Sequence, residues 1–272
     1  MSVRLMLKSR LLLSLAVVVL AGVALIAPAA RASASAASSA KGILPPRNPA
    51  RSLWPSPSFM SACPGTSDGS ACNSVVLAAI AHARQSLEKV GGMSFSLSAY
   101  DRLTPAEQLF VTVNLERTER GLAPATVLSN ALDKIAQAAA QAGRDPALGQ
   151  VPRRLTGGGR TGYLGGTWSG GWLNPLGSDY GWMYDDGPGG DNLACVSAKS
   201  AGCWGHRDII LDTFSSASCG GGQAELAMGA GHEASAGGFS ESDTELIAGV
   251  CGPAPADAAF TWAKAEKLLG IK

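Results

Sequence analysis

The segment CWGHRDIIL, residues 203–211, places an imidazole, a guanidinium and a carboxylate at successive positions between a Cys-Trp pair and an apolar run. Three such polar side chains satisfy one another only if the backbone turns. Gly205 is expected to make that turn, because glycine tolerates most backbone conformations. The run Ile209 to Leu211 is expected to anchor the turn in a core. The polar group therefore predicts a structured site and not a solvated loop.

A second segment, DYGWMYDDG at residues 179–187, ends a short expected helix with the adjacent carboxylates Asp185 and Asp186. The Gly-Pro pair that follows stops a helix firmly. We expect these two carboxylates to face His206.

Together, the Trp182-Met183 pair and GHRDIIL at residues 205–211 resemble the bacterial SCP-like branch of the CAP superfamily. This is the secreted fold of cysteine-rich secretory proteins, antigen five and plant pathogenesis-related proteins. The branch typically has Trp-Met, a short gap and then Gly-His-Arg-x-Asn-Ile-Leu. Residues 114–122, NLERTERGL, are similar to its opening helix, in which Asn-x-x-Arg precedes a Gly-Leu turn. Two departures are Ile209, where the pattern has Asn, and a longer, Gly-rich gap.

The resemblance implies an α+β fold, a CAP-type α-β-α sandwich with a small antiparallel sheet, over residues 103–272. It also implies a surface cavity that two His and two acidic residues line in the family, where they hold a divalent cation. Of these, His206 carries over cleanly. Residues 143–162 contain no histidine, and GGTWSG at 165–170 replaces the expected Gly-Glu-Asn motif.

For the remaining ligands the resemblance implies Asp185, which lies three residues after Trp182, where eukaryotic members have an acid. One His and one Asp hold zinc weakly, because protein zinc sites usually supply at least three ligands. Zinc at His206 is therefore a weak expectation, with Asp186 and His232 as further ligand candidates. The favoured alternative is structural: His206 and its neighbour Arg207 fix the turn through hydrogen bonds.

Four further residues are expected to be structural and not chemical. They flank the two segments quoted above, and they are Trp182, Trp204, Arg207 and Asp208.

The N-terminal part has the composition of an exported protein. Residues 1–32 read as a signal peptide, with three basic residues before an apolar run and a small-residue cleavage site. The apolar run is near membrane-spanning length, so an uncleaved membrane anchor stays open. Residues 33–58, rich in Ala, Ser and Pro, are expected to be a disordered tether. We expect a secreted or cell-wall-associated protein.

Six cysteines in an exported chain predict disulfides, not a metal site or a redox pair. Proximity favours Cys63 with Cys72 and Cys195 with Cys203, which leaves Cys219 for Cys251. The first pair is expected to close a helical extension, residues 59–102, that precedes the CAP-like part.

The charge balance excludes one class of partner. The chain has 22 basic and 21 acidic residues, and without the four basic residues of the signal peptide its formal charge is −3. This balance gives no indication of nucleic-acid binding. A catalytic nucleophile is not predicted either, because no Gly-x-Ser-x-Gly elbow is present and all six cysteines have a predicted partner.

Local patterns predict several elements. Thr104 begins a capping box, and Asp257 is expected to cap a helix over residues 258–269. Residues 157–190 are expected to form aromatic-rich loops. The other expected elements are helices over 73–91, 104–120 and 130–143 and strands over 223–231 and 243–251, with a polar loop from His232 between the strands.

Two functions fit these observations. The favoured one is a non-catalytic secreted protein that binds a small apolar ligand, a glycan or a cell-envelope partner at a cavity near His206, since exposed aromatic rings suit sugars or lipids. Lipid and sterol binding are what the resemblance implies. The alternative is a metal-assisted hydrolase of peptide or cell-wall substrates that uses His206 and Asp185.

Overall fold

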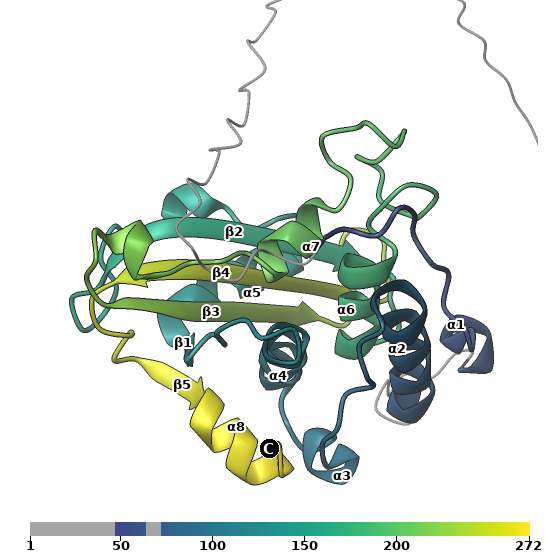
Figure 1. Cartoon of the computed structure of the whole chain (residues 1–272), viewed down its shortest axis with the longest axis horizontal. Helices are drawn as coiled ribbons and strands as arrows, with labels where there is room; N and C mark the ends of the chain where they lie inside the picture. Colours follow the sequence, from purple (N-terminus) through teal and green to yellow (C-terminus); the bar gives the residue numbers. More distant parts are fainter. Residues whose placement is uncertain (1–46, 64–71) are drawn as a thin grey trace, which may run out of the picture. The chain divides into compact units, whose positions relative to one another are not determined.

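The computed structural model describes residues 47–63 and 72–272, and the expected signal peptide lies outside them. The described residues form one compact unit. Its regular elements, drawn in Figure 1, are α1 (Phe59–Ala62), α2 (Asn73–Glu88), α3 (Leu97–Tyr100), α4 (Pro105–Thr118), β1 (Val127–Ser129), α5 (Asn130–Ala142), η2 (Leu148–Gln150), β2 (Arg160–Gly170), α6 (Pro175–Tyr184), α7 (Gly205–Ile210), η3 (Ser216–Cys219), β3 (Ala224–Glu233), β4 (Ser242–Cys251), β5 (Ala258–Thr261) and α8 (Trp262–Leu269).

The strands form a five-stranded sheet in the order β2-β4-β3-β1-β5. β1 runs parallel to β3, and the other pairs are antiparallel. The predicted mixture of helices and strands is confirmed. The sheet is mixed and not wholly antiparallel. The chain leaves β1 through α5, and β3 later forms beside β1 in the same direction.

Helices cover both faces of this sheet (Figure 1). On one face α5 packs against β3, where Gly229 and Gly231 leave room for its backbone. A Cβ atom added at Gly231 would lie 2.4 Å from the backbone nitrogen of Gln137, so only glycine fits this approach. On the other face, α4 packs against β3, and α6 and α7 pack against β2. Each face thus has its own apolar core.

The central helix of the second face, α4, begins as its sequence predicts. The Thr104 hydroxyl accepts a hydrogen bond from the Glu107 backbone, and the Glu107 carboxylate accepts one from the Thr104 backbone. Farther along, Asn114 makes two hydrogen bonds to the backbone of Ala125, at 2.7 and 3.0 Å. This pairing fixes the turn that leads from α4 to β1.

The predicted disulfide pairs are all present: Cys63 with Cys72, Cys195 with Cys203, and Cys219 with Cys251. Disulfides persist in oxidising compartments, so three of them are typical of a protein outside the cytosol. In residues 47–63 and 72–272, no helix has the length and apolar character needed to cross a bilayer.

The expected domain boundaries differ from what the structure shows. Residues 33–46 lie outside the described part, but residues 47–58 do not behave as a tether. Leu53 donates a backbone hydrogen bond to Tyr184, and Ser52 is buried and accepts a bond from the backbone of Gly187. The residues before α1 therefore line α6 as an extended strap.

The helical extension, residues 59–102, is likewise part of the main core. Phe59 is fully buried against Trp172 and Tyr180, with ring centroids 6.0 and 5.6 Å away. Arg84 of α2 is buried and pairs with Glu116 of α4 at 3.0 Å. The expected boundary at residue 103 is therefore not a structural boundary.

Two expected elements are wrong in kind. Residues 160–170, expected as loop because of their glycines, form the long edge strand β2, which pairs with β4 over its whole length. Residues 258–261, expected as helix, form β5, and Thr261 caps α8 instead of Asp257. Asp257 instead accepts a hydrogen bond from the backbone of Ala131, so it caps the start of α5 from outside that helix.

Candidate functional site

The turn before His206 is made by Trp204, not by Gly205. Trp204 has a φ of 62°, in the left-handed region, whereas Gly205 begins α7. Trp204 is held there because its backbone N–H donates to the Asp186 carbonyl at 3.0 Å and its ring packs over Gly187. A Cβ atom at Gly187 would lie 2.1 Å from that ring, so this glycine makes room for the tryptophan.

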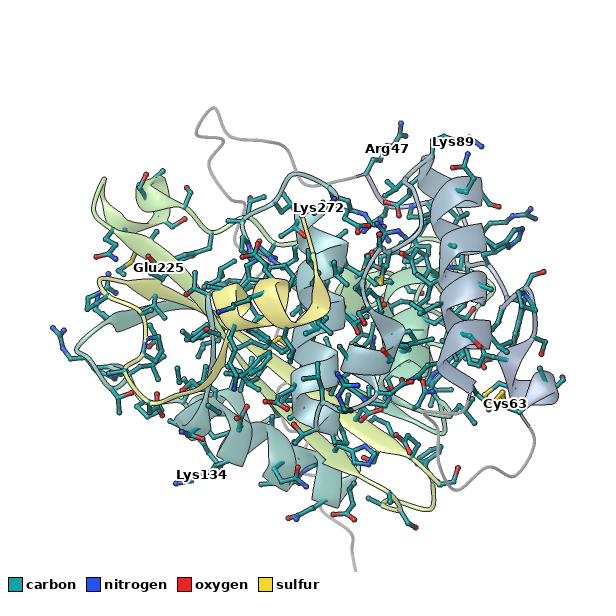
Figure 2. All side chains as sticks on the ribbon, turned by 90° about the horizontal axis from the view of Figure 1, so that it is seen from below. Arg47, Cys63, Lys89, Lys134, Glu225 and Lys272 are labelled. Carbon is teal, nitrogen blue, oxygen red and sulfur yellow. A yellow bond between two sulfur atoms is a disulfide. The ribbon has the colours of Figure 1, made fainter. Side chains whose placement is uncertain are left out.

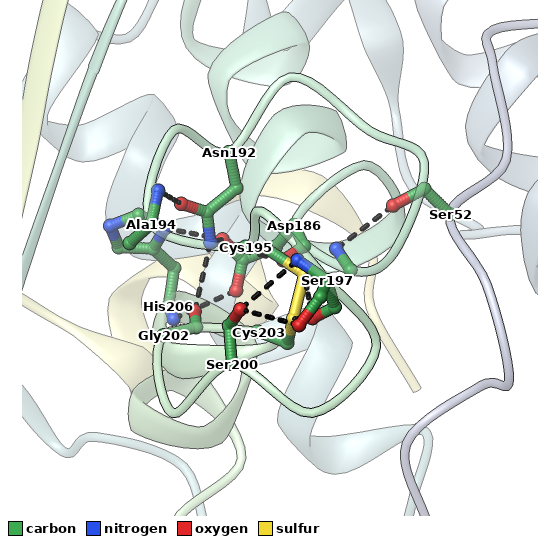
Figure 3. Close-up of a disulfide and its surroundings, with 11 residues drawn as sticks. Ser52, Asp186, Asn192, Ala194, Cys195, Ser197, Ser200, Gly202, Cys203 and His206 are labelled. Atoms are coloured by element: carbon green, nitrogen blue, oxygen red, sulfur yellow. Dashed lines mark hydrogen bonds and ion pairs between the residues drawn. A yellow bond between two sulfur atoms is a disulfide. The ribbon is translucent and has the colours of Figure 1, made fainter.

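Asp186 and His206 meet across the long insertion that separates them in sequence. The His206 ring nitrogen Nδ1 lies 2.6 Å from Asp186 Oδ1, and the His206 backbone N–H donates to Asp186 Oδ2 at 3.0 Å (Figure 3). One carboxylate thus holds both the ring and the backbone of the first turn of α7. Both side chains come from helix ends, since α6 ends at Tyr184 and α7 starts at Gly205.

Burial and this contact set the protonation of the pair. Burial alone would lower the pKa of His206, but the hydrogen bond and charge of Asp186 outweigh it, so the pKa of His206 is raised. Burial also raises the pKa of Asp186, and the contact with His206 offsets this only in part. Both groups therefore keep protons to higher pH than they would in water, and the pair holds its shared proton firmly.

Asp185 has a different role from its neighbour. Its Oδ2 accepts a hydrogen bond from the backbone of Asp191 at 3.1 Å, and it makes no hydrogen bond or ion pair with His206. Burial raises the pKa of Asp185 to about 7. The acid beside His206 is therefore Asp186, and Asp185 instead holds the start of the following loop.

A cavity of about 740 Å³ opens beside this pair. Ligand-binding pockets commonly have volumes of this order. Its walls are mainly aromatic and apolar, and most of its polar residues come from the end of α6, the start of α7 and the loop between them. The residues of the wall and floor are Trp54, Pro55, Ser58, Met60, Asp145, Trp168, Ser169, Gly170, Gly171, Trp172, Gly181, Trp182, Asp185, Asp186, Asp191, Asn192, Leu193, Ala194, His206 and Phe239.

The disulfide loop between α6 and α7 forms one rim of the cavity. The Asn192 amide donates to Asp186 Oδ1 at 2.6 Å and to the Gly202 carbonyl at 2.9 Å (Figure 3). Cys195 and Cys203 close the loop directly after this contact. Leu193 therefore stands at the cavity edge with 94% of its surface exposed.

The residues expected to be structural are held by the core or by surface contacts. Arg207 is fully buried, donates to the Met183 carbonyl at 2.8 Å and pairs with Glu88 of α2. Asp208 is exposed and accepts a hydrogen bond from Asn48 at 2.7 Å. Trp182, also buried, contributes to the cavity wall as well as to the core.

His232 does not line the cavity. It lies near the end of β3, where its Nδ1 is 3.0 Å from Asp243 Oδ1 and 3.2 Å from Glu241 Oε1. Burial alone would lower the pKa of His232, but the hydrogen bonds that its ring donates to these two carboxylates raise it to about 10. In the described ranges, 47–63 and 72–272, this trio is the group of three or more ligating side chains that is close enough for a metal ion, and His206 is outside it.

Several cavity residues lay outside the sequence-based expectations. Trp54 and Met60 line the cavity from the segment expected as tether and extension, and Asp145 reaches it from the loop after α5. Trp168 and Phe239 pack edge to face with ring centroids 5.4 Å apart, although they are far apart in sequence. Only the aromatic richness of residues 157–190 gave a signal for this wall.

Comparison with known proteins gave no relatives: no family model, no curated protein and no solved structure matches this chain. The CAP resemblance therefore stands on the residues quoted above.

Proposed function

We propose that this chain is a secreted or cell-wall-associated, non-catalytic CAP-type protein that binds a lipid-like molecule in the cavity beside His206. The ligand has an apolar body and one hydroxyl group. The observation that carries the proposal is the cavity itself, in which aromatic walls from three parts of the chain surround the Asp186 and His206 pair.

The walls favour an apolar body. Trp168, Trp172 and Phe239 present ring surfaces, and Trp54 and Leu193 stand at the rim with exposed fractions of 59% and 94%. Exposed apolar side chains that gather around a hollow are typical of binding sites. Burying one such side chain under a ligand contributes about 1.5–3 kcal/mol.

The polar residues of the floor favour a single polar group over a glycan. Asp186 already bonds His206 and Asn192, and Asp185 already bonds the backbone of Asp191. A sugar offers many hydroxyl groups, and each one that is buried without a hydrogen-bond partner lowers the affinity of the sugar for the protein. Ser169 Oγ, Trp182 Nε1 and Asp185 Oδ1 have no hydrogen-bond partner among the described residues, but all three atoms are buried under protein. A ligand in the cavity therefore reaches few free partners, and one with a single hydroxyl fits better.

The second ring nitrogen of His206 suits this hydroxyl. Nδ1 faces Asp186, and Nε2 makes no hydrogen bond to any residue in the described part of the chain. The ring is partly exposed, at 28%, so a ligand can reach it. Asp145, Asp185 and Asp186 surround this end of the cavity with acidic groups, so a carboxylate ligand would meet like charge and a hydroxyl would not.

The proposed family supports the same ligand class. The residues that carry the CAP resemblance include His206, which lies in the first turn of α7 and lines the cavity. Lipid and sterol binding are what that resemblance implies.

Titration with cholesterol, followed by tryptophan fluorescence, tests the proposal. Leu193→Ser is expected to weaken binding about tenfold, the equivalent of roughly 1.4 kcal/mol. Val196→Ser is the matched control, because Val196 belongs to the same disulfide loop and is 86% exposed but does not line the cavity. Equal losses in the two variants, or no binding by the wild type, would contradict the proposal.

Glycan binding and metal-assisted hydrolysis are separate outcomes of the same work. Retention on a cell-wall polysaccharide without any lipid binding would favour a glycan. Hydrolysis of a peptide or wall substrate that is lost in His206→Ala would favour the hydrolase. In that case Asp186, and not Asp185, is the acidic partner of the histidine.

A further inference from the structure

The side chains of His232, Glu241 and Asp243 form a polar cluster that the ligand cavity does not use. One ligating atom from each side chain lies within 4.8 Å of the others. His232 Nδ1 is 3.0 Å from Asp243 Oδ1 and 3.2 Å from Glu241 Oε1. A nitrogen donor and two carboxylates thus converge on one point.

The strand pairing brings these side chains together. His232 on β3 lies directly opposite Asp243 on β4 in the antiparallel register. Directly opposed residues point to the same face of a sheet. Glu241 precedes Asp243 by two residues, and its carbonyl accepts a hydrogen bond from the Gly171 backbone at 2.8 Å. The convergence therefore follows from the fold and not from flexible surface chains.

Neighbouring residues orient two of the three groups. The Ser178 hydroxyl of α6 donates to Asp243 Oδ2 at 2.6 Å, which leaves Oδ1 turned to the histidine. The Gln137 side chain of α5 bonds both the N–H and the carbonyl of His232, at 3.0 and 2.8 Å. Such outer contacts are typical of ligating residues, because they fix the geometry before an ion enters.

We propose that His232, Glu241 and Asp243 form a binding site for a divalent transition-metal cation of the zinc type. Zinc bonds of about 2.0–2.2 Å in a tetrahedron place ligand atoms roughly 3.3–3.6 Å apart. The distances of 3.0 and 3.2 Å from His232 Nδ1 to the two carboxylates are close to this range. The imidazole selects zinc-like ions over Mg²⁺ and Ca²⁺, which prefer oxygen ligands only. A bound ion takes the place of the proton that His232 Nδ1 shares with the two carboxylates.

Three protein ligands leave one position for water. Asp243 is fully buried, but the side chains of His232 and Glu241 are 24% and 12% exposed, so an ion can enter from solvent. Removing a buried carboxylate from water costs free energy that a cation offsets. The site is separate from the cavity, so it does not depend on the proposed ligand.

Calorimetric titration of the full secreted protein with Zn²⁺ tests this inference. The wild type is expected to bind one ion, and millimolar Mg²⁺ is expected not to compete. His232→Gln, Asp243→Asn and Glu241→Gln are each expected to weaken binding at least about tenfold. Glu241→Gln is included because it lies at the partly exposed edge and leaves the buried Asp243 in place, so it keeps the test valid if the other variants misfold.

The chain offers matched controls, because it contains three histidines. His82→Gln and His206→Gln are expected to bind zinc as the wild type does. Glu233→Gln also serves as a control, since strand alternation points Glu233 to the opposite face from His232. The inference is overturned if the wild type binds no zinc, if binding survives in Glu241→Gln and Asp243→Asn, or if it is lost in His206→Gln instead.

Discussion

At the scale of single residues, the contact between Asp186 and His206 determines the polar end of the cavity. The Asp186 carboxylate forms hydrogen bonds with the His206 ring, with the backbone N–H at the start of α7 and with the Asn192 amide. It therefore orients the imidazole, so that Nδ1 is used and Nε2 is left for a ligand. Trp204, in its left-handed conformation, supplies the turn that makes this contact possible.

Asp186→Asn is expected to lower the pKa of His206. The amide keeps the shape of the carboxylate but removes the charge that outweighs burial of the ring. Titration of the His206 ring by NMR measures the change. Asp191→Asn is the control, because Asp191 is exposed on the same rim and is not bonded to the ring. An unchanged pKa in Asp186→Asn would show that the pair is not coupled as described.

Arg207→Met is expected to lower the free energy of unfolding by about 3 kcal/mol, because it leaves Glu88 and the Met183 carbonyl with fewer buried partners. Urea denaturation measures the effect. Arg153→Met is the matched control, since Arg153 is exposed and such changes usually stay within about 0.5 kcal/mol. A loss below about 1 kcal/mol in Arg207→Met would contradict a supporting role for this buried cation.

At the scale of elements, two disulfides differ in the length of chain that they close and in their position. The bond between Cys195 and Cys203 spans 8 residues at the cavity rim, and that between Cys219 and Cys251 spans 32 residues at the other end of β4. A cross-link stabilises more when it closes a longer loop. The expected contributions are about 2.5 kcal/mol for the first and about 3.5 kcal/mol for the second.

Serine replacement of each pair separates these roles. The variant without the Cys219 to Cys251 bond is expected to lose more unfolding free energy but to keep ligand affinity. The variant without the Cys195 to Cys203 bond is expected to lose affinity, because Leu193 and Asn192 are no longer held at the rim. Denaturation and cholesterol titration of both proteins provide the comparison. The reverse pattern would contradict the assignment of the short loop to the cavity.

Element patterns that rest on local chemistry could be predicted from the sequence. The capping box at Thr104, the helix from Asn130 and the two long strands depend on neighbours in the chain. β2 could not, because its glycines lower strand propensity and only the pairing with β4 compensates. Asp257 was assigned to the wrong helix because its partner, the start of α5, is more than 120 residues away.

The candidate site shows the same division. Acidic residues ending α6 beside His206 could be predicted, since both segments are short and rich in polar residues. The strap that brings Trp54 to the cavity could not, because its composition is that of a tether and its burial comes from contacts with α6. Which of two adjacent acids faces the histidine depends on the backbone after α6, which composition does not specify.

At the scale of the whole molecule, the compact unit buries an unusual number of acidic groups. Burial raises the pKa of Asp133 and of Asp185 to about 7, and that of Glu245 to about 8. A carboxyl whose pKa is higher in the folded than in the unfolded state favours folding while it is protonated. Its contribution is complete below the unfolded pKa of about 4 and is lost as the pH rises through the folded value.

We therefore expect the melting temperature to fall as the pH rises from about 5 to about 8. Glu245→Gln, which cannot ionise, is expected to melt at a higher temperature than the wild type at pH 9 and at a similar one at pH 5. Glu225→Gln is the control, because Glu225 lies at the start of β3 and is partly exposed. Thermal scans across this range provide the measurement, and a wild-type melting temperature that rises steadily to pH 9 would contradict the expectation.

The fold brings separate segments of the chain together at the cavity beside His206. Figure 2 shows side chains in the space between the helices and the sheet. The cavity beside His206 is lined both by helical residues and by residues of β2. The α6 end, the α7 start, the disulfide loop and the N-terminal strap all meet there. β2, Asp145 and Phe239 complete its lining, so the cavity is assembled from segments that are far apart in the sequence.

A crystal structure of the protein with cholesterol is the most direct test of the proposed ligand site. We expect density for the sterol between Trp168 and Trp172, with the sterol hydroxyl within hydrogen-bond distance of His206 Nε2. Density elsewhere on the molecule, or a cavity that holds only water at saturating cholesterol, would contradict it.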